Sequence, residues 1–301
     1  MTRMRTHVGS LLLGSLLVVS CGPTPGEETR SRKPSSAVMD VKTADSVMIV
    51  AAGDIARGPQ GGRETAALIG RIAPDAVLTL GDNAYEQGTL EEYRSNYEPS
   101  WGRFRSITRP VPGNHDYETP DGKGYFDYFK AEVHGNEYYA WTAGRWRMYA
   151  LNCEIDCGSD SSQLQWLRRD LSRHPGPSLA YVHEPRFTCS TVHPPLGEVR
   201  AVWASLQRAD GRIMLAGHNH AYERFAMLNA DGAPTQNGLR QFVVGTGGAS
   251  SYPVRRPCPS REAQNDRTAG VLKLVLKPDS YTWQFIAVDG RVLDEGRADP
   301  R

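Results

Sequence analysis

Five segments of the chain end in side chains that can bind metal ions. In each, an apolar or proline-bounded stretch leads directly into an acid, an amide or a histidine. The donor-bearing ends are Gly53-Asp54, Gly81-Asp82, Gly113-Asn114-His115-Asp116, His183-Glu184 and Gly217-His218-Asn219-His220. Carboxylates, imidazoles and an amide oxygen without thiolates suit Zn, Fe or Mn, and do not suit copper(I) or an iron–sulfur cluster. The pattern therefore predicts a site for cations.

The chemistry of such a set follows from electrostatics. Two adjacent cations repel each other, so a carboxylate that bridges them is expected. A pair about 3.5 to 4 Å apart can hold the attacking and the leaving oxygen of an in-line displacement. Hydrolysis of phosphate esters is the reaction that this arrangement suits best.

The stretches before the donors predict strands. They are the runs 47–52, 76–80, 110–112, 178–182 and 213–216, which are β-branched, apolar or bounded by proline. Helical spacing of apolar residues falls between the first two strands, at Ala67 to Ile72, and between the third and fourth, at Leu164 to Leu171. This alternation predicts an α/β architecture, in which the carboxyl ends of strands converge on one crevice. Each donor alone is typical of a turn, but turn chemistry does not explain all five together.

The C-terminal third predicts a second sheet. Strands are expected at 241–244, 271–276 and 281–288, and Asp289-Gly290 is a strong signal for a hairpin turn before Arg291, Val292 and Leu293. We find no internal repeat and no second linker, so residues 46–301 are expected to form a single catalytic domain.

Taken in order, the donor segments resemble the motif blocks of the calcineurin-like metallophosphoesterases, and within them the purple acid phosphatases. The family blocks are D-x-G, G-D-x-x-Y, G-N-H-[DE], V-x-x-H and G-H-x-H. Here they correspond to Asp54-Ile55-Ala56, Gly81-Asp82-Asn83-Ala84-Tyr85, Gly113-Asn114-His115-Asp116, Ala180-Tyr181-Val182-His183 and Gly217-His218-Asn219-His220. Ala56 replaces the usual Gly and Ala180 the usual Val, which removes no donor. His193 competes with His183 for the fourth block.

The resemblance implies a fold, two cations and their ligands. The fold is a two-sheet β-sandwich flanked by helices, the αββα metallophosphoesterase fold. One cation would be bound by Asp54, Asp82, Tyr85 and His220, and the other by Asp82, Asn114, His183 and His218. A phenolate such as that of Tyr85 favours Fe(III), and the second ion would be divalent Fe, Zn or Mn. Asp82 would bridge the two ions.

Two cations would lower the pKa of a bound water and stabilise charge on the phosphate. His115 suits a general acid for the leaving alkoxide, with Asp116 as the partner that orients its ring. Alternatively, His115 only positions the phosphate. Glu184 is either the partner of a metal-bound imidazole or a solvated turn residue.

The N-terminus has the features of an export signal. Residues 1–20 combine Arg3 and Arg5 with an apolar stretch that is short for a membrane span, which predicts a signal peptide. Val18-Val19-Ser20-Cys21 resembles a bacterial lipobox, which predicts a lipid on Cys21. Residues 21–45 are rich in Pro, Ser and charged residues and predict a disordered tether. We therefore expect an exported lipoprotein anchored at the cell envelope, in an outer leaflet or outer membrane.

Four further cysteines remain, at positions 153, 157, 189 and 258. In an exported protein an even number favours disulfides. Three pairings are possible, and we predict Cys153 with Cys157 and Cys189 with Cys258. The alternative, a thiolate metal site, lacks paired C-x-x-C spacing.

Composition excludes several functions. With 39% hydrophobic and 23% charged residues the chain is an ordinary globular protein, and its 35 basic and 34 acidic residues favour no nucleic acid and no membrane contact beyond the anchor. The sequence sets no oligomeric state.

The leading hypothesis is a phosphomonoesterase acting on a small phosphate ester. The alternatives are a phosphodiesterase or nucleotidase on the same centre and a non-catalytic metal-holding lipoprotein. Segments 86–101 and 188–199 are expected to form an aromatic-lined cleft that selects the substrate.

Overall fold

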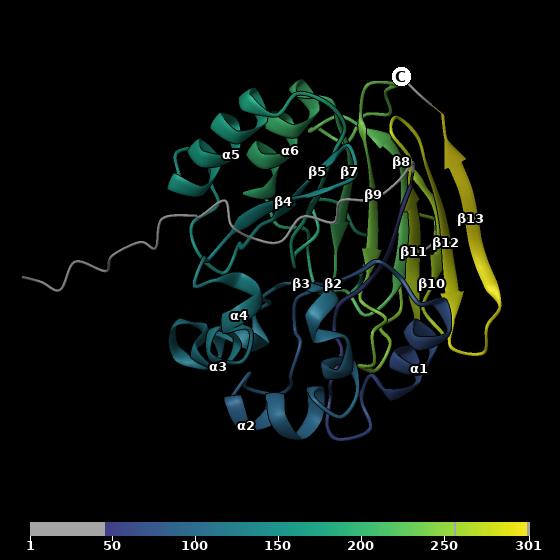
Figure 1. Cartoon of the computed structure of the whole chain (residues 1–301). Coiled ribbons are helices and arrows are strands. Elements are labelled where there is room, and N and C mark those ends of the chain that lie inside the picture. Colours follow the sequence, from purple (N-terminus) through teal and green to yellow (C-terminus); the bar gives the residue numbers. More distant parts are fainter. Residues whose placement is uncertain (1–45, 256, 300–301) are drawn as a thin grey trace, which may run out of the picture. The chain divides into compact units, whose positions relative to one another are not determined.

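The computed structural model describes residues 46–255 and 257–299, and these residues contain two β-sheets. The first sheet has six strands in the order β13-β12-β11-β1-β2-β3 (Figure 1). Their bounds are β1 Val47–Ala52, β2 Ala76–Leu80, β3 Thr108–Val111, β11 Gly270–Leu276, β12 Tyr281–Ala287 and β13 Val292–Ala298. β1, β2 and β3 are parallel, whereas β11 pairs with β1 antiparallel, with Val47 opposite Leu276.

The second sheet has seven strands in the order β10-β8-β9-β7-β6-β5-β4. Their bounds are β4 Tyr139–Ala143, β5 Trp146–Ala150, β6 Ser178–Tyr181, β7 Gly211–Ala216, β8 Tyr222–Leu228, β9 Leu239–Val244 and β10 Arg261–Asn265. The four central strands β5, β6, β7 and β9 are parallel to one another. The outer strands pair antiparallel.

The five predicted donor-bearing strands all form, but the structure divides them between the two sheets. β1, β2 and β3 lie in the first sheet, whereas β6 and β7 lie in the second. The expectation that a separate second sheet comes from the C-terminal third is therefore wrong. β9 joins β7 in the second sheet, while β11, β12 and β13 extend the first sheet from β1. The fold itself, two sheets flanked by helices, is as predicted.

The burial pattern explains the layers. All six residues of β7 are buried. Ile213 and Leu215 belong to the large core cluster shared with β1 and β11, whereas Met214 belongs to a second cluster that includes residues of α5 and α6. Side chains of a strand point alternately to opposite faces, so a strand buried on both faces lies between two apolar layers.

Helices cover the outer faces. α5 (Ser162–Arg173) and α6 (Val199–Arg208) lie together beside the second sheet (Figure 1). α1 (Arg63–Ile72) packs against β11 of the first sheet. The Ser161 hydroxyl caps α5 by accepting a hydrogen bond from the Leu164 N–H at 3.1 Å.

Short helices fill the connection from β2 to β4. Their bounds are α2 Leu90–Glu92, α3 Lys123–Tyr128 and α4 Lys130–Val133, with a π-helix at Tyr93–Tyr97 and 3-10 turns at Trp101–Ile107, His115–Tyr117 and Pro120–Gly122. Tyr93, Tyr97 and Trp101 are fully buried here, and the Tyr93 ring stacks on Tyr128 at 4.8 Å between centroids. The expectation that aromatic residues of segment 86–101 line a cleft is therefore wrong, because these rings form core.

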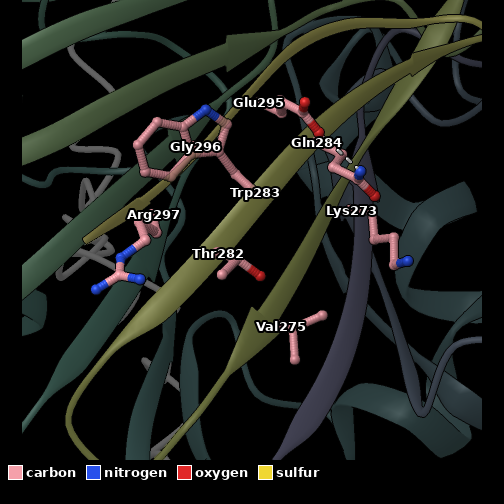
Figure 2. Close-up of a pocket in the computed structure, with 8 residues that line it drawn as sticks. All are labelled: Lys273, Val275, Thr282, Trp283, Gln284, Glu295, Gly296 and Arg297. Atoms are coloured by element: carbon pink, nitrogen blue, oxygen red, sulfur yellow. Dashed lines mark hydrogen bonds between the residues drawn. The ribbon is translucent and has the colours of Figure 1, made fainter. Parts of the chain in front are cut away.

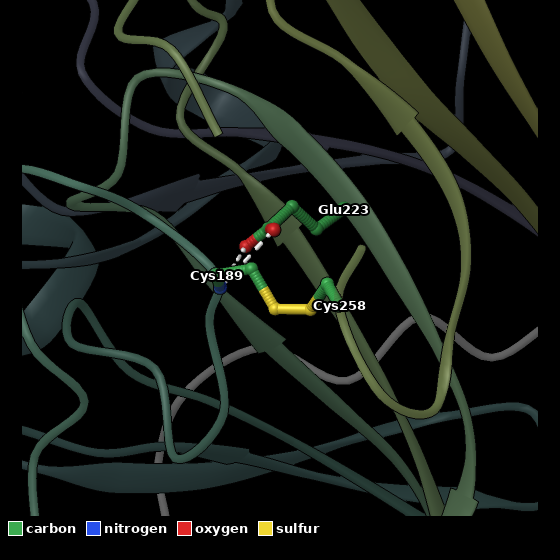
Figure 3. A group of neighbouring side chains, drawn as sticks. All are labelled: Cys189, Glu223 and Cys258. Atoms are coloured by element: carbon green, nitrogen blue, oxygen red, sulfur yellow. Dashed lines mark hydrogen bonds between the residues drawn. A yellow bond between two sulfur atoms is a disulfide. The ribbon is translucent and has the colours of Figure 1, made fainter. Parts of the chain in front are cut away.

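The predicted disulfide pairing is confirmed. Cys153 is bonded to Cys157 and Cys189 to Cys258, with Cα separations of 5.2 and 6.1 Å. The second bond links the segment after β6 to the segment before β10. Figure 3 shows it beside the carboxylate of Glu223. Because both sulfurs are bonded to each other, this group is not a thiolate metal site.

A hollow of about 480 Å³ lies on the outer strands of the first sheet, away from the predicted ligands (Figure 2). Its lining comes only from β11, β12 and β13: Lys273, Val275, Thr282, Trp283, Gln284, Glu295, Gly296 and Arg297. None of the donor segments contributes to it.

Among the described residues, no helix combines the length and the apolar character that crossing a bilayer requires. The predicted signal peptide, the lipidated Cys21 and the tether at 21–45 fall outside the described residues. The single-domain assignment of 46–301 stays a prediction.

Candidate metal centre

The donors predicted from sequence come together where the two sheets present their strand ends. One possible ligand atom from each of Asp54, Asp82 and His183 lies within 4.8 Å of the others, and all three residues are buried. Asp54 and Asp82 follow β1 and β2 of the first sheet, and His183 follows β6 of the second. The donors thus come from both sheets, which the rule for a single open sheet did not anticipate.

Contacts on one side of Asp82 form a first group of donors. The Tyr85 hydroxyl lies 3.0 Å from Asp82 Oδ2 and 3.1 Å from Asp54 Oδ1. His220 Nε2 lies 3.1 Å from the Tyr85 hydroxyl and 3.2 Å from Asp54 Oδ1. These are the four residues that the resemblance assigns to the first cation.

Contacts on the other side of Asp82 form a second group. His183 Nε2 lies 3.4 Å from Asp82 Oδ1 and 3.2 Å from Asn114 Oδ1. It also lies 3.2 Å from His218 Nδ1. These are the residues that the resemblance assigns to the second cation, and Asp82 faces both groups with different oxygens. The arrangement matches the predicted sets, while metal binding itself stays a prediction.

Backbone carbonyls orient two of the imidazoles. His183 Nδ1 lies 2.7 Å from the Leu80 carbonyl oxygen, and His220 Nδ1 lies 2.7 Å from that of Ser250. A carbonyl oxygen can only accept, so each Nδ1 carries a hydrogen, and each Nε2 faces the cluster as the atom that could bind a cation once it is deprotonated. This is the orientation that metal-bound histidines require.

Charge in the cluster favours cations. Burial, and then the charges of Asp54 and Asp82, raise the pKa of the Tyr85 hydroxyl well above its ordinary value. Burial by itself would lower the pKa of His183, but the charge of Asp82 outweighs it and raises that pKa. Without a cation, both protons are therefore retained: that of Tyr85 keeps the phenol neutral, and that on His183 Nε2 offsets carboxylate charge. A bound cation would displace them, because ligands must be deprotonated. The donor set thus fits the two cations that the resemblance implies.

Backbone strain and tight packing are concentrated at this site. Asp54, Asp82 and His218 have positive φ angles of 60°, 49° and 65°. Left-handed backbone is costly for residues other than Gly and persists where surrounding structure enforces it, often at functional sites. A Cβ on Gly81 would lie 2.3 Å from His183 Nδ1, and one on Gly113 would lie 2.3 Å from Asp82 Oδ1. These glycines leave space for the ligands, beyond the turn role that sequence indicated.

His115 lies at the edge of the first group. Its Nδ1 is 2.6 Å from the Glu86 carbonyl oxygen, and its ring centroid is 4.5 Å from that of Tyr85. Its backbone N–H donates to Asp82 Oδ1 at 2.9 Å. The imidazole is only partly buried, so it is accessible to a substrate.

The prediction that Asp116 orients the His115 ring is wrong. Asp116 is fully buried and accepts hydrogen bonds from the Tyr93 hydroxyl at 2.6 Å, the Gly113 N–H at 2.9 Å and the Asn83 side-chain amide at 2.9 Å. The Glu86 carbonyl takes the place that Asp116 was expected to hold. Asp116 instead joins the loop after β2 to the loop after β3, and thereby positions ligands from both.

Glu184 does not orient the imidazole of His183 either, because the Leu80 carbonyl occupies Nδ1. Glu184 lies close to Glu154, and burial together with the charge of Glu184 raises the pKa of Glu154 to about 9.

Ala56, which replaces a Gly of the family block, pairs with Ala84 in an isolated β-bridge, and the replacement removes no donor from the site.

Two further side chains lie at the site: His193, which belongs to the segment 188–199 expected to line a cleft, and Tyr252, which the sequence did not indicate. The His193 ring lies 4.4 Å from that of His218 between centroids, and the Tyr252 ring stacks on His220 at 4.0 Å. His193 was a competitor for the fourth block; its ring lies beside that of His218, whereas His183 is the histidine that lies close to Asp54 and Asp82. A second histidine ten positions after His183 was the available signal. Tyr252 gave none.

The fold and the site define a two-sheet α/β protein with a buried cluster of carboxylate, phenol, amide and imidazole donors. The family model of the calcineurin-like phosphoesterases matches residues 47–222. The chain belongs to this family, and it resembles its purple acid phosphatases as the motif blocks predicted.

Curated relatives support the resemblance. Purple acid phosphatase 22 of Arabidopsis thaliana is 22% identical over 182 residues, covering 52% of this chain and 42% of its own. Purple acid phosphatase 21 of the same plant is 29% identical over 183 residues, covering 52% and 41%. The chain thus spans less than half the length of these relatives.

Solved structures share the fold. A purple acid phosphatase from yellow lupin seeds superposes with a TM-score of 0.70 at 16% identity, covering 85% of this chain and 54% of its own. A dimetal phosphatase from Danio rerio gives a TM-score of 0.55 at 13% identity, covering 85% and 99%.

Proposed function

We propose that the protein is an exported, metal-dependent phosphomonoesterase that hydrolyses small phosphate esters at a two-cation centre. One observation carries the proposal: the donors fall into two groups that share Asp82, with one of its oxygens in each group. Family membership and the purple acid phosphatase relatives support it.

The residues of the site have two kinds of role in this proposal, binding cations and orienting the side chains that bind them. Asp54, Asp82, Tyr85 and His220 would hold one cation, and Asp82, Asn114, His183 and His218 the other. Bound cations would supply charge neutralisation for the phosphate and activation of water. Asp116 and the carbonyls of Leu80 and Ser250 hold these ligands in place without joining them.

His115 is the proposed general acid. Its Nδ1 must carry a hydrogen, because the Glu86 carbonyl opposite can only accept. Nε2 is then the atom that would give a proton to the leaving oxygen. The carbonyl, rather than a carboxylate, fixes the ring.

Elemental analysis and an assay on the same metal-reconstituted preparation test the proposal. We expect two cations per chain and faster hydrolysis of p-nitrophenyl phosphate than of bis(p-nitrophenyl) phosphate. Asp82→Asn should lose bound metal and activity together, whereas Glu91→Gln, an exposed control, should lose neither. His115→Ala should keep both metals and lose about 10²- to 10⁴-fold in rate on an ester with a poor leaving group.

Three results would contradict parts of the proposal. Fewer than two cations in well-folded protein would overturn the centre. Faster turnover of the diester would favour a phosphodiesterase or nucleotidase. Two bound cations without hydrolysis of either ester would favour the non-catalytic, metal-holding protein.

A further inference from the structure

A pocket of about 500 Å³ lies next to the metal centre, between two segments joined by the Cys189–Cys258 disulfide. Its lining is Thr188, Cys189, Ser190, Thr191, Val192, His193, Pro194, Pro195, Arg255, Pro257, Cys258 and Pro259. Of the two segments expected to select the substrate, 188–199 contributes its residues 188–195 to this pocket, whereas the aromatic residues of 86–101 are core.

The pocket adjoins the donor cluster at His193. This residue lines the pocket, and its ring lies 4.4 Å from the His218 ring and 5.6 Å from the Tyr252 ring. Tyr252 in turn stacks on His220. A group bonded to a phosphate at the donor cluster would therefore lie beside His193, at the wall of the pocket.

The pocket walls are fixed in place. Besides the disulfide, the Arg255 N–H donates to the Cys189 carbonyl at 2.7 Å, and the Thr191 hydroxyl donates to the Pro253 carbonyl at 3.1 Å. The amide of Asn219, which lies between two predicted ligands, donates to the Thr188 hydroxyl at 3.0 Å. Such a site is preorganised, because little ordering remains to oppose binding.

One positive charge in the pocket is uncompensated. The neighbouring Arg261 is neutralised by the buried carboxylate of Glu223 at 2.8 Å, which also accepts from Thr188 and from the Cys189 N–H (Figure 3). Arg255 is exposed, and within the described residues its guanidinium has no ion pair. Among the residues that the structure describes, no acidic side chain lines the pocket.

We propose that this pocket binds the leaving group of the substrate and that Arg255 selects leaving groups that carry a second anion. The inference rests on the proposed function and specifies its substrate class: a phosphate monoester whose alcohol portion bears a carboxylate or another phosphate. The proline rings and the disulfide pack against the body of that portion. Arg255 is a specificity residue, distant from the reacting phosphate.

A matched pair of esters tests this selection on the full, metal-reconstituted chain. The pair is 4-carboxyphenyl phosphate and its neutral analogue 4-carbamoylphenyl phosphate, and the measured quantity is the ratio of their kcat/KM values. Differences in leaving-group reactivity affect every variant equally, so they cancel when ratios are compared. Arg255→Gln should lower the ratio about two- to fivefold, through KM for the carboxylate ester.

Two variants serve as controls. Arg255→Lys keeps the charge and should retain part of the preference. Arg94→Gln removes an exposed charge outside the pocket and should leave the ratio unchanged. Because Arg255 is exposed, the preference should also weaken as salt is raised.

The outcomes separate the two proposals. Hydrolysis of both esters with the same ratio in the original protein and in Arg255→Gln would overturn the role of Arg255 and leave the phosphatase intact. An equal loss in Arg94→Gln would show a general charge effect and would also overturn it. Failure to hydrolyse either ester would overturn the proposed function, and the subsite with it.

Discussion

At the scale of single residues, the geometry of the site depends on the groups that orient the predicted ligands as much as on those ligands themselves. Leu80 and Ser250 contribute only their carbonyl oxygens, yet these fix which nitrogen of His183 and His220 faces the cluster. Asp116 contributes a buried carboxylate that accepts hydrogen bonds from the loop after β2 and from the loop after β3. Mutations at such positions would act through ligand geometry.

Tyr85 allows a direct test of the first cation group. Its hydroxyl pKa is raised in the metal-free cluster, by burial first and then by two carboxylates, so a phenolate forms only when a cation compensates. Tyr85→Phe should abolish the visible phenolate-to-iron absorption band of an iron-loaded sample. Calorimetry in buffers of different ionisation enthalpy should show about one proton fewer released on metal binding.

A colourless iron-loaded protein, or a band that persists in Tyr85→Phe, would remove Tyr85 from the ligand set. Tyr93→Phe is the matched control. Its hydroxyl also meets a buried carboxylate, that of Asp116, but lies outside the donor groups.

The donors could be predicted from sequence because each follows a strand directly. The partners of their rings could not, because they are backbone carbonyls far away in the chain, as Leu80 is from His183. Asp116 was expected beside His115 because the two are adjacent in sequence. Adjacent residues of a 3-10 turn point in different directions, however, and Asp116 turns into the core.

At the scale of elements, the strands before the donors were predictable and the division into sheets was not. Apolar runs define β1 and β2 to the residue. Pairing of β11 with β1 joins segments at opposite ends of the domain, and local periodicity contains no information about such a partner. β4, β5, β8 and β10 carry polar and aromatic residues in place of apolar runs, so their sequences gave no strand signal.

One side chain connects the outer strands of both sheets. Asp294 of β13 accepts hydrogen bonds from Tyr222 at 2.6 Å and from Arg224 at 2.7 and 2.9 Å, both on β8 of the other sheet. The Trp283 indole also donates to it at 3.1 Å. Arg224 and Asp294 thus form an ion pair between the two sheets.

Asp294→Asn should reduce the free energy of unfolding by about 2 kcal/mol near neutral pH, because hydrogen bonds to a charged group are lost. Burial would raise the pKa of Asp294, but the bonds from Arg224 and Tyr222 outweigh it and lower that pKa. A carboxyl group whose pKa is lower in the folded state stabilises the protein at pH values above its unfolded-state pKa, which is near 4. This stabilisation is lost as the pH falls through the folded-state pKa. The difference in free energy of unfolding between Asp294→Asn and the original protein should therefore become smaller in acid.

Urea unfolding of both proteins at a series of pH values measures this difference. Glu295→Gln, the exposed neighbour on the same strand, should remain close to the original protein throughout. A deficit that stays constant down to the lowest pH would show that Asp294 does not act through its charge.

At the scale of the whole molecule, the prediction of export depends on the N-terminus, outside the described residues. Cleavage before Cys21 would leave a lipid-bearing cysteine as the first residue. Mass spectrometry of protein from a bacterial envelope should show a mature chain that begins at Cys21 and carries acyl chains, and Cys21→Ser should release it from the membrane fraction. An unmodified N-terminus beyond Cys21 would refute the anchor.

The two disulfides differ mainly in how much chain they enclose. Cys189 and Cys258 are separated by 69 positions, and Cys153 and Cys157 by 4. In the chain-entropy account, a crosslink destabilises the unfolded state more when its loop is longer, which gives about 4 kcal/mol for the first and about 2 kcal/mol for the second. Replacing each pair by serines should therefore lower the free energy of unfolding about twice as much for the long loop. Equal losses would mean that local packing, and not chain entropy, sets the contribution of these bonds. Only the long-loop variant should also alter the selection between the two phosphate esters, because Cys189–Cys258 is the one of the two disulfides that joins the walls of the pocket.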